Sequence, residues 1–334
     1  MDNRPLVSVC CITYNHAPFI SRCIEGFLMQ KTSFPFEIII NDDCSTDGTT
    51  EILKQYAGKN PNLIRLVLHD ENQFSKGVRS VLATFVYPLA KGKYIALCEG
   101  DDYWIDPYKL QKQVDFMESH DDVSLVFSRC HVLSNGKYID NEYPNFKGID
   151  DCYFNSEQIY TKWMIPTATI LCRSSLIKTY IDNRIYAGDI VLNLSMAEQG
   201  KVFGMSDYTA VYRINEDGLT LSRKKETLAM WERYVAHIQF LSENFTSVPK
   251  RCYNKALQNV YCNIFNINYD RGICDYKSLL HIFRLSPLKA IELAAGKFII
   301  RVFHLNKGSR VRSLYRRFRY PQKINVDNNN RLYY

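Results

Sequence analysis

The sequence predicts an α/β protein in which a mostly parallel sheet is flanked by helices and followed by a helical C-terminal extension. Over the first hundred residues, short apolar runs typical of strands alternate with segments that have apolar residues at helical spacing. Helices that connect successive strands imply parallel pairing and right-handed crossovers. The chain has 334 residues, of which 46% are hydrophobic and 23% charged, which suits one sizeable core with an appendage.

Four apolar runs in this first part predict strands, and the first of them is nearly continuous, as expected for a strand covered on both faces. The runs span residues 6–12, 36–40, 64–68 and 94–98. Three helices are predicted between them, with apolar residues at helical spacing within residues 20–28, 52–56 and 78–89. The polar segment before the second helix supplies several possible N-caps, and we expect Asp47 to be one.

The following hundred residues are less regular. A helix is predicted from Pro107 to about residue 120, and the segment from about 130 to 165 is interpreted as loops and short strands along one wall of a cleft. The other predicted elements are strands over residues 123–127, 168–172, 202–205 and 209–213 and a helix over residues 189–198 that Gly200 ends.

A change of pattern near residue 223 predicts a domain boundary. From there onward the sequence is helical and aromatic, with no strand signal. We therefore expect a first domain over residues 1–222, made of halves at about 1–105 and 106–222. Residues 223–334 would form a helical, basic C-terminal region.

Basic charge is concentrated near the C-terminus. The formal net charge is +7, yet nine basic and no acidic residues lie between Glu292 and Asp327. Such a basic amphipathic segment suits an anionic membrane surface, although its apolar stripe could instead pack on the first domain. No nucleic-acid recognition motif accompanies the charge, so we expect no nucleic-acid partner. The stripe consists of Ile291, Ala295, Phe298, Val302 and Leu305, with Lys297 and Arg301 on another face.

Cysteine usage and the N-terminus bear on the compartment. The eleven cysteines are odd in number and have no CxxC spacing, and several lie inside apolar runs, where a reduced thiol behaves as a small hydrophobe. No run approaches the ~20 apolar residues of a membrane span, and residues 1–5 lack the apolar core of a signal peptide. We expect a cytoplasmic protein, peripheral on the inner face of the cell membrane if the basic segment binds lipid.

The tetrapeptide Glu99-Gly100-Asp101-Asp102 is the strongest functional signal. It follows a predicted strand, so its three carboxylates gather at the sheet edge where α/β proteins bind ligands. Crowded carboxylates repel one another unless a cation neutralises them, and hard oxygen ligands suit Mg²⁺ or Mn²⁺. The alternative is a solvated acidic turn that caps the next helix.

Three segments in register resemble family 2 glycosyltransferases. They are residues 7–15, residues 37–49, and residues 90–95 leading into 99–102, and the similarity extends over about residues 5–220. The resemblance implies a GT-A fold, a nucleotide-sugar donor and inversion at the anomeric carbon. The segment that starts at the acidic tetrapeptide also resembles a bacterial subgroup that builds surface polysaccharides.

The resemblance assigns the donor site to the ends of the first two strands. Thr13-Tyr14-Asn15 would contact the nucleoside, because an aromatic side chain at a strand end can stack on a base. Asp43 would accept a hydrogen bond from the base N–H, whereas Asp42 would brace the loop.

The same resemblance divides the acidic tetrapeptide. Asp101 would be the main metal ligand, and Glu99, which replaces the usual first aspartate, would reach a ribose hydroxyl or a metal-bound water. Asp102 is left open between a second metal ligand and a helix cap. Trp104 is left open between the floor of the sugar site and the core.

Two later residues complete the predicted site. Inverting transfer needs a base for the acceptor hydroxyl, and the resemblance places Asp189 in that role, although it could simply be the N-cap of its helix. Arg213 would contact the diphosphate of the donor or pair with a core acid. Asn215 stands where histidine is common in the family, which leaves it as a weak metal ligand at most.

The predicted function is therefore a metal-dependent inverting glycosyltransferase of hexosyl or N-acetylhexosaminyl type. The expected donor is a UDP-sugar, and the expected acceptor is a glycan or a lipid-linked saccharide in surface polysaccharide synthesis. One alternative is a nucleotide-sugar-binding module without catalysis, which the three aspartates 43, 101 and 189 argue against. The other is a sugar-phosphate nucleotidyltransferase, which would need a glycine-rich phosphate loop where Thr13-Tyr14-Asn15 stands.

Overall fold

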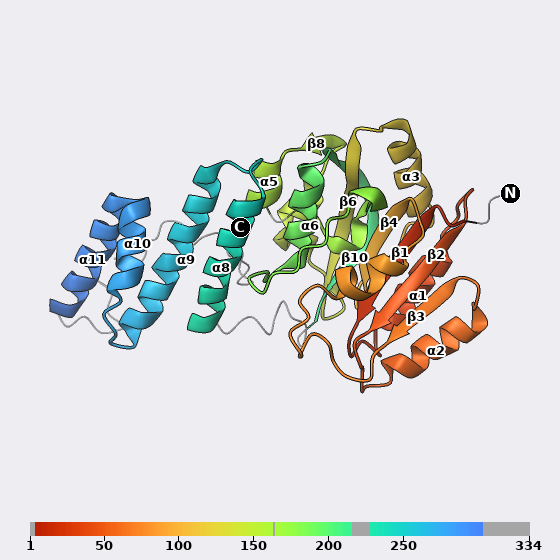
Figure 1. Cartoon of the computed structure of the whole chain (residues 1–334), viewed down its shortest axis with the longest axis horizontal. Helices are drawn as coiled ribbons and strands as arrows, with labels where there is room; N and C mark the ends of the chain where they lie inside the picture. Colours follow the sequence, from red (N-terminus) through yellow and green to blue (C-terminus); the bar gives the residue numbers. More distant parts are fainter. Residues whose placement is uncertain (1–3, 163, 216–226, 303–334) are drawn as a thin grey trace. The chain divides into compact units, whose positions relative to one another are not determined.

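The computed structural model describes residues 4–162, 164–215 and 227–302 (Figure 1). Its contacts divide the chain into two compact units, residues 1–222 and 223–334. The predicted basic residues from Lys307 onward lie outside the described residues, as does the segment around residue 222 where the domain boundary was predicted.

A ten-stranded mixed sheet forms the centre of the first unit, which confirms the predicted α/β fold. The strands are β1 (Val7–Thr13), β2 (Phe36–Asp42), β3 (Ile64–Leu68), β4 (Tyr94–Glu99), β5 (Tyr103–Trp104), β6 (Val123–Ser134), β7 (Lys137–Tyr138), β8 (Cys152–Phe154), β9 (Leu171–Arg173) and β10 (Lys201–Ile214). Their order is β3-β2-β1-β4-β9-β6-β10-β5, with β7 paired to β6 and β8 paired to β10.

The N-terminal half of the sheet is parallel, as the helical crossovers require. Strand β1 lies between β2 and β4, with Thr13 paired to Asp42 and Ile12 paired to Glu99. The three strands therefore end at the same level. Since the polar segments that follow them start from one edge, the fold brings together the residues predicted for the donor and the metal.

Helices flank this sheet and fill its faces with apolar side chains. In α1 (Ile20–Leu28), the buried residues recur at the 3.6-residue period that a core-facing helix requires. The other helices of this unit are α2 (Thr49–Lys59), α3 (Lys109–Ser119), α4 (Pro144–Lys147), α5 (Ser156–Thr161) and α6 (Gly188–Ala197), with short turns at Leu82–Val86, Tyr87–Leu89, Asp140–Glu142, Thr167–Thr169 and Ser174–Leu176.

The predicted third helix is wrong in type. The segment 78–89 contains a π-helical turn over Leu82–Val86 and a 3-10 turn over Tyr87–Leu89 instead of a regular α-helix. Pro88 explains the difference, because proline lacks an N–H and its ring clashes with the preceding turn of a helix.

Several predicted strand boundaries also differ. Strand β6 continues seven residues beyond the predicted end at residue 127, and the run predicted at 168–172 is a 3-10 turn followed by β9. The two strands predicted at 202–205 and 209–213 form one strand, β10, whose register against β6 shifts between Met205 and Tyr208. The polar residues at this bulge break the apolar pattern without ending the strand.

The second unit is helical in its described part. It contains α8 (Leu228–Asn244), α9 (Lys250–Asp270), α10 (Tyr276–Leu285) and α11 (Pro287–Val302). No helix in the described ranges is both long and apolar enough to cross a membrane.

Candidate active site at the ends of the parallel strands

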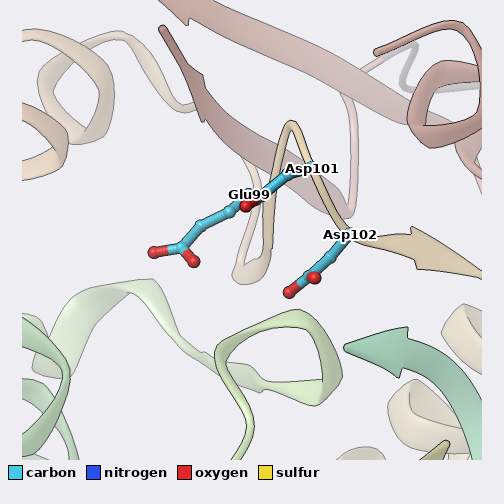
Figure 2. A group of neighbouring side chains, drawn as sticks. All are labelled: Glu99, Asp101 and Asp102. Carbon is cyan, nitrogen blue, oxygen red and sulfur yellow. The ribbon is translucent and has the colours of Figure 1, made fainter. Parts of the chain in front are cut away.

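The acidic tetrapeptide forms a tight turn between β4 and β5. Glu99 ends β4, and each of Glu99, Asp101 and Asp102 offers a carboxylate oxygen within 4.8 Å of the other two. Figure 2 shows the three side chains projecting from this single turn. The predicted gathering of carboxylates is therefore what the fold produces.

Gly100 allows the turn to lie directly against the end of β1. Its N–H donates to Ile12 O (2.9 Å), and a Cβ at this position would lie 2.6 Å from Thr13 Oγ1. It would also come within 3.0 Å of His16 Nδ1. Such contacts are too short for any side chain, so only glycine fits here.

Asp102 is the buried acid of the turn. The residue is 1% exposed, and its Oδ1 accepts a hydrogen bond from Arg213 N (2.7 Å), whereas Oδ2 is buried with no hydrogen-bond partner. Burial raises the pKa of Asp102 well above its usual range, and the charges of Asp101 and Glu99 raise it further. Because helix α3 begins with Tyr108 as its N-cap, Asp102 does not cap that helix.

Asp101 is held from three sides. Its Oδ2 accepts from Asn215 Nδ2 (2.9 Å), its main-chain oxygen accepts from Arg213 Nε (2.8 Å), and His16 Nε2 lies 3.9 Å from Oδ2. Asn215 thus meets the carboxylate through its amide nitrogen. Arg213 braces the turn with its guanidinium over the Phe19 ring, 4.6 Å from the centroid, and pairs with no core acid in the described residues.

These residues fit a divalent cation. A buried carboxylate oxygen without a partner is costly, and Asp102 Oδ2 is in that position beside two further carboxylates. A hard cation bound to Asp101 and Asp102 would satisfy this oxygen and remove the repulsion that raises the Asp102 pKa. The donor set, which consists entirely of oxygens, suits Mg²⁺ or Mn²⁺.

The loop after β1 is tied to the loop after β2. Asn15 adopts a left-handed backbone conformation (φ 53°), its N–H donates to Ser45 Oγ (2.8 Å), and its Oδ1 accepts from Thr46 N (2.9 Å). Tyr14 is 46% exposed, so its ring is open to a planar ligand, whereas Thr13 is buried. The loops therefore present Tyr14 at the edge of the sheet.

Asp42 and Asp43 have different partners. Asp42 accepts from Ser45 and Thr50, which agrees with the predicted bracing of the loop. Asp43 accepts from two main-chain N–H groups, Gln73 N to Oδ1 (2.6 Å) and Phe74 N to Oδ2 (3.0 Å). Each carboxylate oxygen keeps a second lone pair, so these bonds leave Asp43 able to accept from a ligand.

Asp47 and Trp104 are structural residues. The prediction of Asp47 as the N-cap of α2 is wrong, since Gly48 occupies that position. Asp47 Oδ1 still accepts from Thr49 N (3.1 Å) at the start of α2, and its Oδ2 accepts from Ala17 N (2.9 Å). Trp104 is buried, donates from Nε1 to Ala168 O (2.7 Å) and packs edge-on against Phe27. It therefore belongs to the core and does not floor a sugar site.

Asp189 lies in the first turn of α6, where Ala187, not Asp189, is the N-cap. Its Oδ1 accepts from Ile190 N (2.9 Å), and the side chain is half-buried. Helix α6 packs on α5, β6 and β10. In the described residues no hydrogen bond or ion pair joins Asp189 to the acidic turn.

Two sets of contacts around the site have little or no signal in the sequence. His16 is close to Asp101, with a buried Nδ1 that has no partner, and its only sequence signal is its position directly after Thr13-Tyr14-Asn15. The segment 72–74 encloses Asp43, and Asn72 Nδ2 also donates to Asp43 O (3.0 Å). That segment has no motif, so only the fold shows its role.

The fold and the acidic turn define an α/β enzyme scaffold with a ligand edge at the ends of parallel strands. The model of the glycosyl transferase family 2 matches residues 8–178, slightly more than half of the chain. The chain belongs to this family.

Relatives support the same assignment over most of the first unit. A protein of Mycobacterium tuberculosis (strain H37Rv) is 32% identical over 228 residues, which cover 68% of this chain and only 64% of that protein. TuaG of Bacillus subtilis (strain 168), whose name assigns it provisionally to teichuronic acid biosynthesis as a glycosyltransferase, is 28% identical and covers 76% of this chain and 98% of TuaG. The Escherichia coli UDP-Glc:alpha-D-GlcNAc-diphosphoundecaprenol beta-1,3-glucosyltransferase WfaP is 27% identical. The match covers 67% of this chain and 83% of WfaP.

Solved structures share the fold at low sequence identity. The Staphylococcus aureus TarS fragment 1–349 in complex with UDP has a TM-score of 0.56 at 17% identity and covers 94% of this chain and 86% of that chain. The mannosyltransferase PcManGT from Pyrobaculum calidifontis in complex with GDP-Man and Mn²⁺ has a TM-score of 0.56 at 16% identity. The match covers 95% of this chain and 85% of PcManGT. This likeness identifies the architecture as the GT-A fold.

Proposed function

We propose that the chain is an inverting, metal-dependent glycosyltransferase acting in surface polysaccharide synthesis. It would move a hexosyl or N-acetylhexosaminyl group from a nucleotide-sugar to a hydroxyl of a glycan or lipid-linked saccharide. The observation that carries the proposal is the acidic turn, in which three carboxylates gather around the buried Asp102 against the end of β1 and the loop that follows it. Family membership and the provisional role of TuaG support it.

The proposed donor is a UDP-sugar. Tyr14 would stack on the base, Asp43 would accept from its N–H, and Thr13, Asn15 and Asp42 would shape the surrounding loops. The name of WfaP contains UDP-Glc, and TarS was solved with UDP and with UDP-GlcNAc, which supports uridine over the guanosine of the PcManGT ligand.

The proposed cofactor is Mn²⁺ or Mg²⁺, held by Asp101 and Asp102, with Glu99 directed to a ribose hydroxyl or a bound water. When bound, the cation would offset the charge that develops on the departing nucleoside diphosphate. Arg213 would add positive charge on the same side while it fixes the main chain of the turn. The Mn²⁺ in the PcManGT structure supports the choice of metal.

Asp189 is the proposed base. As the acceptor oxygen bonds to the anomeric carbon and the bond to the diphosphate breaks, the Asp189 carboxylate would take the hydroxyl proton. Its place in the first turn of α6, where Oδ1 accepts from Ile190 N, supports this role because a side chain held in this way can be aimed at the acceptor.

The proposed acceptor is lipid-linked, in line with the diphosphoundecaprenol acceptor in the name of WfaP. An anionic membrane surface, met through the C-terminal helices, would then be a second partner. The enzyme would then act at the inner face of the cell membrane.

A nucleotide-sugar panel with Mn²⁺, Mg²⁺ or EDTA tests the proposal. Asp101→Asn should abolish metal-dependent turnover while the chain stays folded, and Asp189→Asn should lower kcat by roughly 10²–10⁴-fold with little change in nucleotide Kd. Asp121→Asn, at an exposed position, is the matched control, and its turnover should equal that of the wild type. Turnover that is unaffected by EDTA and by Asp101→Asn would refute the metal site, and full transfer by Asp189→Asn would refute the base.

A further inference from the structure

Helix α10 leaves a row of large apolar side chains exposed to solvent. Tyr276, Leu280 and Phe283 are 73%, 50% and 49% exposed. At about 100° per residue they lie within roughly 60° of one another, so they form one stripe along the helix. On the opposite face Ser278 and Ile282 are buried, and Ile282 belongs to the small core of this unit.

Basic side chains flank the same stripe on one side. Lys277 and Arg284 are exposed and lie roughly 40–60° beyond Leu280 around the helix. Neither has an ion-pair partner within the described residues, and no acidic residue occurs from 276 to 291. Asp275, just before the helix, is engaged as its cap, since its carboxylate accepts from Ser278 N (3.0 Å) and Asn268 Nδ2 (2.8 Å).

We propose that this face of α10 docks on an anionic membrane surface. The "α10 face" consists of Tyr276, Leu280 and Phe283 with Lys277 and Arg284. Apolar side chains next to unpaired basic ones match the boundary between acyl chains and anionic headgroups. A second copy of the chain would bring the same basic residues toward each other, which charge repulsion disfavours.

The α10 face differs from the surface that the sequence predicts. The predicted stripe lies on α11 from Ile291 to Val302, and its last residue, Leu305, lies outside the described residues. Ala290 and Leu293 are the residues by which α11 packs into the core of this unit, and the side chains beyond Ala295 are not described. Two observations support the α10 face: its side chains are exposed to solvent, and their spacing places them on one side of the helix. It narrows the membrane partner of the proposed function to one helix face and does not depend on the proposed catalytic activity.

Vesicle co-sedimentation of the full chain tests the docking. Vesicles of phosphatidylcholine with about 30% phosphatidylglycerol are compared with pure phosphatidylcholine. Leu280→Gln/Phe283→Gln removes the apolar stripe, and Lys277→Gln/Arg284→Gln removes the flanking charge. Lys250→Gln/Lys255→Gln on α9 is the matched control, with the same charge change at exposed positions.

We expect the wild type and the α9 control to sediment with anionic vesicles only. The apolar variant should bind at least tenfold more weakly, and the basic variant about 25-fold more weakly, or roughly fivefold per charge. All variants should keep the wild-type circular dichroism and nucleotide-sugar turnover with a soluble acceptor, which separates this proposal from the proposed function.

Three results would overturn the proposal. Wild-type binding by the apolar variant would mean that charge outside α10 drives attachment. An absence of wild-type binding together with a dimer that Leu280→Gln/Phe283→Gln dissociates would make a second copy the occupant. Binding to vesicles only after deletion of residues 303–334 would make that segment the cover of α10.

Discussion

Lys109 shows how a single residue beside the site affects the stability of the fold. Its side chain is buried, and Nζ donates to Gln113 Oε1 (2.7 Å) and lies 4.4 Å from the centre of a Trp104 ring. Burial lowers the pKa of Lys109 to about 7, against smaller raising effects of Cys98 and Asp106. A buried amine without a carboxylate partner prefers to be neutral. Folding therefore favours loss of the Lys109 proton near neutral pH.

This pKa predicts a pH-dependent contribution to stability. An unfolded lysine titrates near ~10.4, so between about pH 7 and pH 10 the unfolded chain binds the extra proton and the contribution of Lys109 to the free energy of unfolding rises with pH. Lys109→Met should remove this rise. Urea unfolding at pH 7, 8 and 9 should therefore show the variant gaining most over the wild type at pH 7, by an amount that shrinks as the pH increases.

Lys112→Met on the same helix is the control for this prediction. Lys112 is exposed and paired with Asp106 and Asp207, which raise its pKa. Its folded and unfolded forms are both charged at pH 7–9, so its removal should shift stability equally at each pH. A constant difference between the wild type and Lys109→Met over this range would contradict the assignment.

The individual site residues differ in how far sequence could predict them. Asp101 and Asp102 follow a strand within one short motif, so their proximity is local and predictable. The contact of Asn215 with Asp101 spans 114 positions and the contacts of Asp43 with residues 73 and 74 span about 30, so both depend on strand pairing. Local spacing in the sequence cannot predict contacts between residues that are so far apart in the chain.

At the scale of elements, the position of the acidic turn depends on close packing between α1 and β5. Gly26 faces the main chain of Trp104, and a Cβ at this position would lie 2.9 Å from Trp104 N and 3.0 Å from Trp104 O. Trp104 follows Asp102 by two residues. The close packing of α1 therefore fixes the position of β5, the strand that follows the acidic turn.

Gly26→Ala should destabilise the chain and loosen the site. The added methyl meets main-chain atoms that cannot rotate away, so we expect a cost of about 1–3 kcal/mol in the free energy of unfolding. Urea titration measures this cost, and calorimetric Mn²⁺ binding should weaken in parallel. Gly58→Ala in α2 is the matched control, because its Cβ meets nothing within 4 Å and should stabilise the helix by up to ~1 kcal/mol. Equal stability of both variants would refute the packing argument.

The elements that sequence predicted well are those with a strong and uniform pattern. The first four strands agree with the predicted apolar runs to within two residues, because each run is continuous and mainly apolar. Strands β1, β2 and β4 are largely buried, whereas β3 lies at the edge of the sheet and is only partly buried. The bulged strand β10 was divided in two, because Ser206 and Asp207 are polar in the middle of a strand. Their side chains have partners on other elements, since Ser206 bonds Asp151 and Asp207 pairs with Lys112, and these bonds are invisible in the local pattern.

On the scale of the whole molecule, all proposed catalytic and donor-binding residues lie in the first unit. The acidic turn, the loops after β1 and β2, Asp189 and Arg213 belong to residues 1–222, whereas the α10 face belongs to residues 223–334. The contacts of the acidic turn that the structure describes come from β1, the loop after it, α1, β10 and the residue after β10. This separation suggests that catalysis and membrane docking are carried by different parts of the chain.

A fragment of residues 1–222 should therefore fold and keep the donor site. Its whole sheet and the hydrophobic cluster that contains the parallel strands are drawn from residues 6–214 of the described chain, so the strands that carry the donor site lie within the fragment. We expect a cooperative thermal transition and a UDP affinity within about threefold of the full chain in the presence of Mn²⁺, measured by calorimetry. Co-sedimentation with anionic vesicles should be lost. A fragment that aggregates, or that folds but binds UDP more than tenfold more weakly, would show that residues 223–334 are needed for the donor site as well.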